Sequence, residues 1–312
     1  MLHMGCARRL SVDVDIICPP GTDISKFLGT YSEEYGFTSF KEESRETITD
    51  IDKTHVKYHY NVAYIGGERS EKILLDVLFE DNHYSEVVQI PISGSLLKSE
   101  GEPVMVKVPS LADLFGDKLT AFAPHTCGIP FDKPTRGGTK DCSMEICKQM
   151  FDIASLYDTV QDMASVSATF RKFAAVELAY RHLDVADTDA VLRDAFKTAL
   201  CISSTGQYGD KEESKRLMRG VSQVRSFIHS EKYGGIYATT DAAKVAYSAA
   251  LIYYGEQKAI KPYDRNNPPA PVLLKNTAIN KLNCLRLGNP EALYYWCAVD
   301  EILNRNNNGI LE

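Results

Sequence analysis

The chain has 312 residues and a formal net charge of −7, and 44% of its residues are hydrophobic and 25% charged. This composition is typical of a globular protein, and the length suits two domains of ordinary size. No apolar run approaches the roughly 20 residues of a membrane helix, and the N-terminus has no apolar signal-peptide segment, which argues against a membrane-spanning or secreted protein. The eight cysteines form no CxxC pair, so we expect reduced thiols in a cytoplasmic protein.

An acidic strand is predicted near the start of the chain, over residues 8–18. Alternate residues of a strand point to the same face, so Ser11, Asp13 and Asp15 share one side and the apolar residues between them the other. Two carboxylates this close repel each other unless a cation lies between them, and a hard divalent ion is the natural candidate. From this pattern alone, an ordinary half-buried strand with its polar face in water is the alternative.

A second acidic strand is predicted at residues 71–81, with Asp76 inside its apolar segment. An unpaired carboxylate is costly there, and buried charges are normally paired or metal-bound. Three carboxylates on two neighbouring strands, Asp13, Asp15 and Asp76, form the arrangement that two-metal phosphoryl or nucleotidyl transfer requires.

Strand-like alternation extends over residues 46–108, and the pattern becomes helical after Pro109. His55 and His59 would share a strand face, which we interpret as surface alternation and not as zinc ligation, because no Cys or further His lies near them. The individual strands are predicted at 56–64, 73–79, 87–92 and 104–108.

The second part of the chain is predicted to be helical. Ser110 and Asp113 approximate a capping box at the start of its first helix, and residues 124–142, with several Pro and Gly, are predicted to form a loop. Further helices are predicted at 143–164, 168–183, 188–204, 212–231, 240–257, 270–284 and 290–304. The sequence therefore predicts an α+β protein, with a sheet domain at 1–109 followed by a helical domain at 110–312.

Lys118 lies on the apolar stripe of the first predicted helix, at helical spacing from Leu114, Phe115 and Phe122. A lysine on the buried side of a helix needs an anionic partner. Either its stem lies along apolar surface while the ammonium reaches water, or the ammonium meets the triphosphate of a bound nucleotide.

Several segments resemble, in order, the motifs of the AbiEii/AbiGii toxin family, within the nucleotidyltransferase superfamily typified by DNA polymerase β. The matching segments are Gly5–Cys6, Arg9–Ile16, Leu75–Val77, Phe115–Ala121 and Phe151–Asp158. The resemblance implies a nucleotidyltransferase domain with a mixed β-sheet, then a helical domain, with the active site in the cleft between them. It also implies Mg²⁺-dependent nucleotide transfer from an NTP, and its toxin members are similar to enzymes that modify the 3′ end of tRNA.

The resemblance implies catalytic and binding roles for individual residues. Asp13 and Asp15 would bind two Mg²⁺ ions, and Asp76 would hold one ion and act as general base on the acceptor hydroxyl. Lys118 would bind the triphosphate, and Asp152 would position Lys118 or the nucleophile, unless it is a solvent-facing helix charge. The residues bordering the nucleotide would be Gly5, Cys6, Arg9 and Ser11.

Two departures from the family pattern affect nucleotide binding. The superfamily usually has a Ser or Thr hydroxyl beside the glycine turn, whereas this chain has Gly5–Cys6. The chain also begins four residues before Gly5, so the strand and helix that normally precede this turn are absent or very short. We therefore expect either a truncated N-terminus or a phosphate turn that is built differently.

Positive charge is concentrated late in the chain. Between Arg193 and Arg286 there are 15 Lys or Arg against 8 Asp or Glu, a balance of +7, so the remainder carries −14. A basic helical region beside an acidic catalytic sheet is what an enzyme acting on a polyanion such as tRNA would have. A solvated helical surface is the alternative.

These observations together predict a cytoplasmic, metal-dependent nucleotidyltransferase that acts as the toxin of a toxin–antitoxin system. Its partners would be an NTP, an acceptor such as the tRNA 3′ end, and a cognate antitoxin protein, with no membrane. The alternatives are transfer to a small molecule or a protein, or a non-catalytic nucleotide-binding or partner-binding remnant with a truncated N-terminus.

Overall fold

The structure is a computed structural model. It describes residues 3, 8–11, 13–24, 26–28, 37–45, 54–63, 70–94, 100–135, 137–160, 162–229, 232–256 and 261–312, with the backbone alone in 37–45, 54–63 and 70–73. The chain divides into two compact units: Leu10–His83, and Met1–Arg9 together with Tyr84–Glu312. The domain boundary at residue 109 stays a prediction. The fold class is α+β, with a mixed sheet in the first unit and mainly helices in the second.

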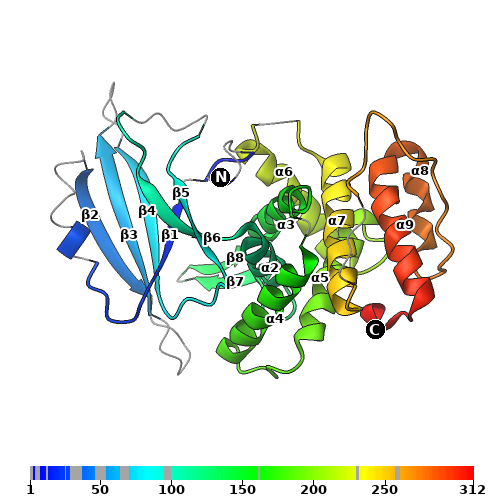
Figure 1. The fold of residues 1–312 in the computed structure, drawn as a ribbon, viewed down its shortest axis with the longest axis horizontal. Helices are drawn as coiled ribbons and strands as arrows, with labels where there is room; N and C mark the ends of the chain where they lie inside the picture. The colour runs from blue at the N-terminus through cyan, green and yellow to red at the C-terminus, as the bar shows by residue number, and fades with distance from the viewer. Residues whose placement is uncertain are drawn as a thin grey trace. The chain divides into compact units, whose positions relative to one another are not determined.

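The smaller unit holds a four-stranded sheet in the order β1-β4-β3-β2 (Figure 1). The parallel pair is β1 (Asp13–Cys18) and β4 (Ser70–Phe79), while β3 (Thr54–Ala63) is antiparallel to both β4 and β2 (Phe37–Arg45). The strands β1, β3 and β4 are predicted from the sequence. The edge strand β2 is not, because its segment is rich in charged residues and has no apolar alternation, which is common on exposed edges.

One face of this sheet is apolar. Val77 on β4 is fully buried, and Ile24 from the segment after β1 packs with it. The partly buried residues around this pair are Ile16, Cys18, Leu28, Leu75 and Phe79. Because successive strand residues alternate between faces, this packing leaves Asp13, Asp15 and Asp76 on the opposite face.

The larger unit opens with a hairpin of β5 (Val87–Pro91) and β6 (Met105–Pro109), followed by α2 (Leu111–Ala121). As predicted, Ser110 caps α2, and its hydroxyl accepts a hydrogen bond from the Asp113 amide. Gly116 allows close packing on a later helix, since a Cβ there would lie 2.7 Å from the Phe170 amide nitrogen. The segment around Lys118 is therefore held firmly by its neighbours.

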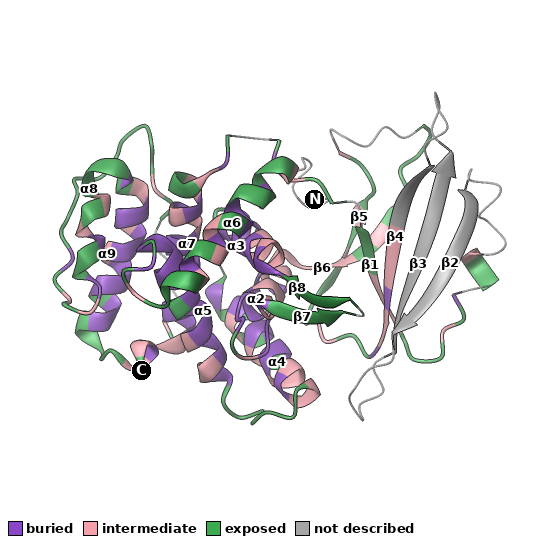
Figure 2. Cartoon of the chain, turned by 180° about the vertical axis from the view of Figure 1, so that it is seen from behind, coloured by how far each residue is buried: buried purple, intermediate pink, exposed green. Residues whose placement is uncertain are grey.

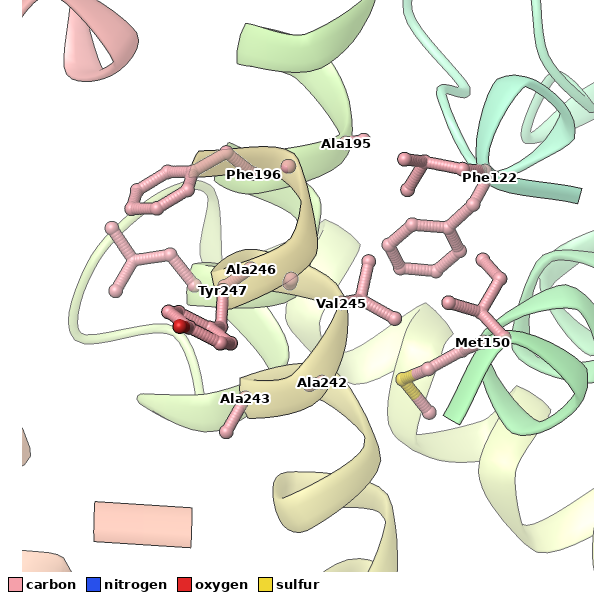
Figure 3. Close-up of a cluster of buried hydrophobic side chains, with 14 of the residues drawn as sticks. Phe122, Met150, Ala195, Phe196, Ala242, Ala243, Val245, Ala246 and Tyr247 are labelled. Carbon is pink, nitrogen blue, oxygen red and sulfur yellow. The ribbon is translucent and has the colours of Figure 1, made fainter. Parts of the chain in front are cut away.

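The core of the larger unit surrounds α7 (Gly235–Tyr253), which is buried over most of its length (Figure 2). Met150 of α3, Phe196 of α5 and Phe122 at the end of α2 pack around this helix, which contributes Val245 to the same core (Figure 3). The other helices are α3 (Ser143–Tyr157), α4 (Met163–Tyr180), α5 (Thr188–Ser203), α6 (Lys211–Val224), α8 (Leu285–Gly288) and α9 (Pro290–Arg305). Short 3-10 turns lie at Arg225–Phe227 (η2), Asn280–Cys284 (η3) and Gly309–Leu311 (η4). Within the described residues, no helix is long and apolar enough to cross a membrane.

The helix predicted at 270–284 is wrong, because only the 3-10 turn η3 forms at its end. In this segment, side-chain oxygens accept hydrogen bonds from backbone amides that would otherwise bond within a helix. Asn283 Oδ1 accepts from the Leu274 amide at 2.8 Å, and Asp300 Oδ1 accepts from the amides of Lys275 and Asn276. Such local side-chain bonds compete with a helix, and Pro271 lies at its expected start.

The loop predicted at 124–142 is wrong in part. It contains a short hairpin of β7 (Asp132–Thr135) and β8 (Gly138–Asp141), paired antiparallel. Gly138 adopts a φ of +134°, which few residues other than glycine tolerate.

Candidate functional site

The three predicted metal-binding carboxylates lie on one face of the sheet in the smaller unit. Asp15 and Asp76 are register partners on the parallel strands β1 and β4, and Asp13 stands two residues before Asp15. Adjacent strands are about 4.8 Å apart, so the Asp15 and Asp76 backbones are immediate neighbours. Asp13 and Asp15 are exposed and Asp76 is half-buried, so the three positions remain open to solvent on this face.

The donor chemistry fits a hard divalent cation, because carboxylate oxygens are the ligands that Mg²⁺ prefers. The side chains do not gather around a common point: within the described ranges, no group of three or more His, Cys, Asp or Glu is arranged to hold a metal ion. Exposed carboxylates change rotamer at little cost, and the register keeps the Asp15 and Asp76 backbones adjacent whichever rotamer their side chains adopt.

A charge cluster in the larger unit joins the other predicted site residues. Lys118 on α2 lies 2.8 Å from Asp152 Oδ2 on α3. Arg9 donates a hydrogen bond to each oxygen of Asp152: its Nε to Oδ1 and its Nη2 to Oδ2, both with a distance of 2.7 Å. Burial alone would raise the pKa of Asp152, but the charges of Lys118 and Arg9 and the hydrogen bonds they donate outweigh it and hold that pKa below its usual value.

This cluster has one more positive than negative charge. Its three side chains are 15% to 25% exposed, so they are shielded from water without being sealed from it. Gln149 on α3 lies near Lys118 and accepts a long hydrogen bond of 3.5 Å from its Nζ. The anionic partner expected for Lys118 is therefore Asp152.

Arg9 belongs to a short N-terminal segment that is anchored to the larger unit. Its backbone forms an antiparallel bridge with Ile228, and the guanidinium of Arg8 lies 5.7 Å from the centre of the Phe151 ring. The sequence placed Arg9 beside the nucleotide and did not predict its pairing with Asp152. No local pattern signals a contact between residues 143 positions apart.

Of three further predicted residues, the structure describes only Ser11. Gly5 and Cys6, expected to border the nucleotide, lie outside the described residues. Ser11 is exposed, and its hydroxyl donates a long 3.5 Å hydrogen bond to the Asp13 carbonyl oxygen. The resemblance gave no role to Asp158, which pairs with Lys244 at 2.7 Å.

Several basic residues between Arg193 and Arg286 are neutralised within the larger unit. Arg216, for example, lies 2.7 Å from Asp132 and 3.4 Å from Asp141. Among the described residues, ion pairs formed by a Lys or Arg of this region include Arg193–Asp187, Lys215–Glu212, Arg216–Asp132, Arg216–Asp141, Arg219–Asp141, Lys244–Asp158 and Arg265–Glu291. These pairs reduce the positive charge that the region offers to an external polyanion.

Comparison with known proteins relates the chain to one family. A family model described as "Nucleotidyl transferase AbiEii toxin, Type IV TA system" matches residues 1–220. That range contains β1, β4, α2 and α3, which carry the residues described above. The crystal structure of JHP933 from Helicobacter pylori is similar over 82% of this chain and 81% of that one, with 14% identity and a TM-score of 0.38. No curated protein matches.

Proposed function

Because the chain belongs to the AbiEii family of nucleotidyltransferase toxins of type IV toxin–antitoxin systems, we propose that it transfers a nucleoside monophosphate from an NTP to an acceptor hydroxyl. The products would be the modified acceptor and pyrophosphate. The observation that carries this proposal is the register of β1 and β4, which sets Asp15 beside Asp76 with Asp13 on the same face.

The three carboxylates would hold two Mg²⁺ ions. Bound there, these ions would supply the positive charge that stabilises the reacting phosphate and lowers the pKa of the attacking hydroxyl. Asp76, on the inner strand of the pair, would accept the proton of that hydroxyl as it attacks the α-phosphorus. Asp13 and Asp15, both exposed, would offer oxygens to the ions from the edge strand.

Lys118 would bind the triphosphate. Lys118 and Arg9 contact the same carboxylate, that of Asp152, so these three side chains together carry one net positive charge. The ammonium has three donors, and the contact with Asp152 orients it while leaving donor capacity for a ligand. Asp152 and Arg9 are positioning residues in this proposal, since they act through Lys118.

The acceptor is proposed to be the 3′ end of tRNA, with a cognate antitoxin protein as the cellular partner. Transfer to a small molecule or to a protein hydroxyl uses the same groups and is tested in the same experiment. A non-catalytic nucleotide-binding protein is the second candidate, which is favoured by the lack of convergence among the three carboxylates.

The test is incubation of the full chain with each α-labelled NTP in turn, Mg²⁺ and total RNA, followed by location of the label. We expect one NTP to label RNA of tRNA size. Asp13→Asn should abolish the label, whereas Asp81→Asn, which changes an exposed carboxylate just after β4, should retain it. Label on protein or on a small molecule would replace the tRNA acceptor, and no label with any NTP would favour the non-catalytic candidate.

A further inference from the structure

The basic residues of the sheet all occupy one face. The register places every Lys, Arg and His of β2, β3 and β4 at positions that share the face of Asp13, Asp15 and Asp76. We call this set the cationic half-face; its members are Lys41, Arg45, His55, Lys57, His59 and Lys72. Glu43 is the one acidic residue at the positions of β2 and β3 on that face.

The opposite positions of the same strands carry no basic residue. On β3 they are Thr54, Val56, Tyr58, Tyr60 and Val62, which the register places on the same face of the sheet as Val77. The sheet is therefore amphipathic, and its basic residues are segregated onto the carboxylate face instead of being spread over both faces.

The geometry of a sheet gives the scale of the half-face. Strands are about 4.8 Å apart, so β3 and β2 lie roughly 5 and 10 Å from the column of Asp76. Residues two apart on a strand are separated by roughly 6.7 Å, so the positions from Lys41 to Arg45 extend over about 13 Å. Lys57 is the register partner of Asp76, and His59 lies in the row of Asp13.

A series of cations at regular spacing suits a chain of phosphates better than a single compact group. Proteins that bind single-stranded nucleic acid use a positively charged surface that follows the backbone. The competing basic region, on the helices, is partly neutralised by the ion pairs of Lys215, Arg216 and Arg219. The half-face places a row of basic positions on β2, β3 and β4 that reaches the position of Asp76.

We propose that the cationic half-face binds the phosphodiester backbone of a single-stranded acceptor and leads its 3′-hydroxyl to Asp76. This inference rests on the proposed nucleotidyl transfer for its direction, but the binding itself requires neither metal nor NTP. The same cations could instead meet the triphosphate of the NTP, and the two sources of phosphate are distinguished by experiment.

The test is fluorescence anisotropy with the full chain and a labelled single-stranded RNA of about 12 nucleotides, without Mg²⁺ or NTP, at several salt concentrations. Lys41→Glu with Lys57→Glu should weaken binding at least tenfold. On single strands, each phosphate contact adds about 0.7 to the steepness of the plot of log affinity against log salt concentration. Because this variant removes two contacts, its plot should be less steep than that of wild type by about 1.4. The matched control, Lys215→Glu with Arg219→Glu, changes the charge equally at two side chains that are 69% exposed on α6 and should bind within about twofold of wild type.

A neutral pair, Lys41→Gln with Lys57→Gln, guards against misfolding of the charge-reversed protein. Its thermal unfolding should match wild type while its RNA affinity falls by an intermediate amount. Wild-type affinity in the neutral and reversed variants, or an equal loss in the α6 control, would overturn the inference. So would variants that weaken NTP binding and leave RNA binding unchanged, since the phosphate partner would then be the triphosphate.

A further variant separates this inference from the proposed function. Asp13→Asn should be inactive in transfer yet bind RNA as well as wild type or better, because a negative charge beside the half-face is removed. Loss of RNA binding in Asp13→Asn would contradict the inference, because it would assign the RNA contact to the carboxylate site. If wild type binds RNA through Lys41 and Lys57 but labels no acceptor, the proposed function fails and the binding surface stands.

Discussion

The ammonium of Lys118 lies 2.8 Å from Oδ2 of Asp152, which joins α2 to α3 through a half-shielded ion pair. Arg9 completes the coordination of the same carboxylate from outside the two helices. Because a single acid restrains two cations, its removal should disturb both stability and the orientation of Lys118.

Asp152→Asn should lower the free energy of unfolding by roughly 2 to 4 kcal/mol, because Lys118 and Arg9 would lose their charged acceptor in a shielded site. Asp189→Asn is the control: it breaks the more exposed pair with Arg171 and should cost no more than about 1 kcal/mol. The measurement is urea unfolding followed by circular dichroism. A cost for Asp152→Asn as small as that of the control would show that the cluster adds little to stability.

The contribution of Asp152 to stability should depend on pH. Its pKa is lowered in the folded protein, so its stabilising contribution is complete above the unfolded pKa of about 3.9 and is lost as the pH falls through the folded value. The difference in unfolding free energy between wild type and Asp152→Asn should therefore be constant from pH 7 to 5 and shrink below about pH 4. A difference that stays constant down to pH 3 would mean that the Asp152 pKa is not lowered by its neighbours.

Local signals in the sequence account for much of the fold. The alternation of apolar and polar residues predicts β1 and β4. The position of Asp76 inside an apolar run indicates a carboxylate that is paired or metal-bound. The sequence predicts that the two strands are neighbours, but not that they are parallel or in this register, which patterns within single strands do not specify. The neighbourhood of Asp15 and Asp76 is thus a property of the assembled sheet.

The partners of charged residues on helices are harder to predict from the sequence than the strands are. The sequence leaves Asp152 either as a positioning group or as a solvent-facing helix charge, whereas in the structure it is the partner of Lys118 and Arg9 from other segments. Asp158, to which the sequence gives no role, is the partner of the buried Lys244. The helix predicted at 270–284 failed for a related reason, because Asn283 and Asp300 satisfy backbone amides that helical periodicity alone assigns to a helix. In both cases long-range polar contacts determined the outcome.

The pair of Lys244 and Asp158 should respond unequally to loss of either partner. Lys244 is only 7% exposed whereas Asp158 is 39% exposed. Asp158→Asn leaves a buried ammonium without its counter-charge and should cost roughly 2 to 3 kcal/mol, while Lys244→Met leaves a carboxylate that water can reach and should cost less than about 1 kcal/mol. Urea unfolding of both variants measures this, and equal costs would contradict the asymmetry.

Lys118→Ala should weaken NTP binding by tenfold to a hundredfold, since a charged hydrogen bond to phosphate is worth about 1.5 to 3 kcal/mol. Lys172→Ala, an exposed lysine on α4, is the control and should bind NTP as wild type does. Isothermal titration with each NTP measures the affinity, and thermal unfolding checks that the variant is folded. Unchanged NTP affinity in a folded Lys118→Ala protein would remove the triphosphate role and leave Lys118 as a structural partner of Asp152.

Asp13→Asn, Asp15→Asn and Asp76→Asn should each lower the rate of transfer by at least about a thousandfold, because each removes an oxygen proposed to hold a catalytic ion. None should destabilise the fold appreciably, since relief of repulsion between neighbouring carboxylates offsets the lost charge. A readout that needs no activity is also available: Mg²⁺ should raise the unfolding temperature of wild type, as any ligand of the folded state does, and this rise should vanish in the three variants but persist in Asp81→Asn. If Mg²⁺ stabilises Asp76→Asn as strongly as wild type, the facing positions of Asp15 and Asp76 do not form a metal site.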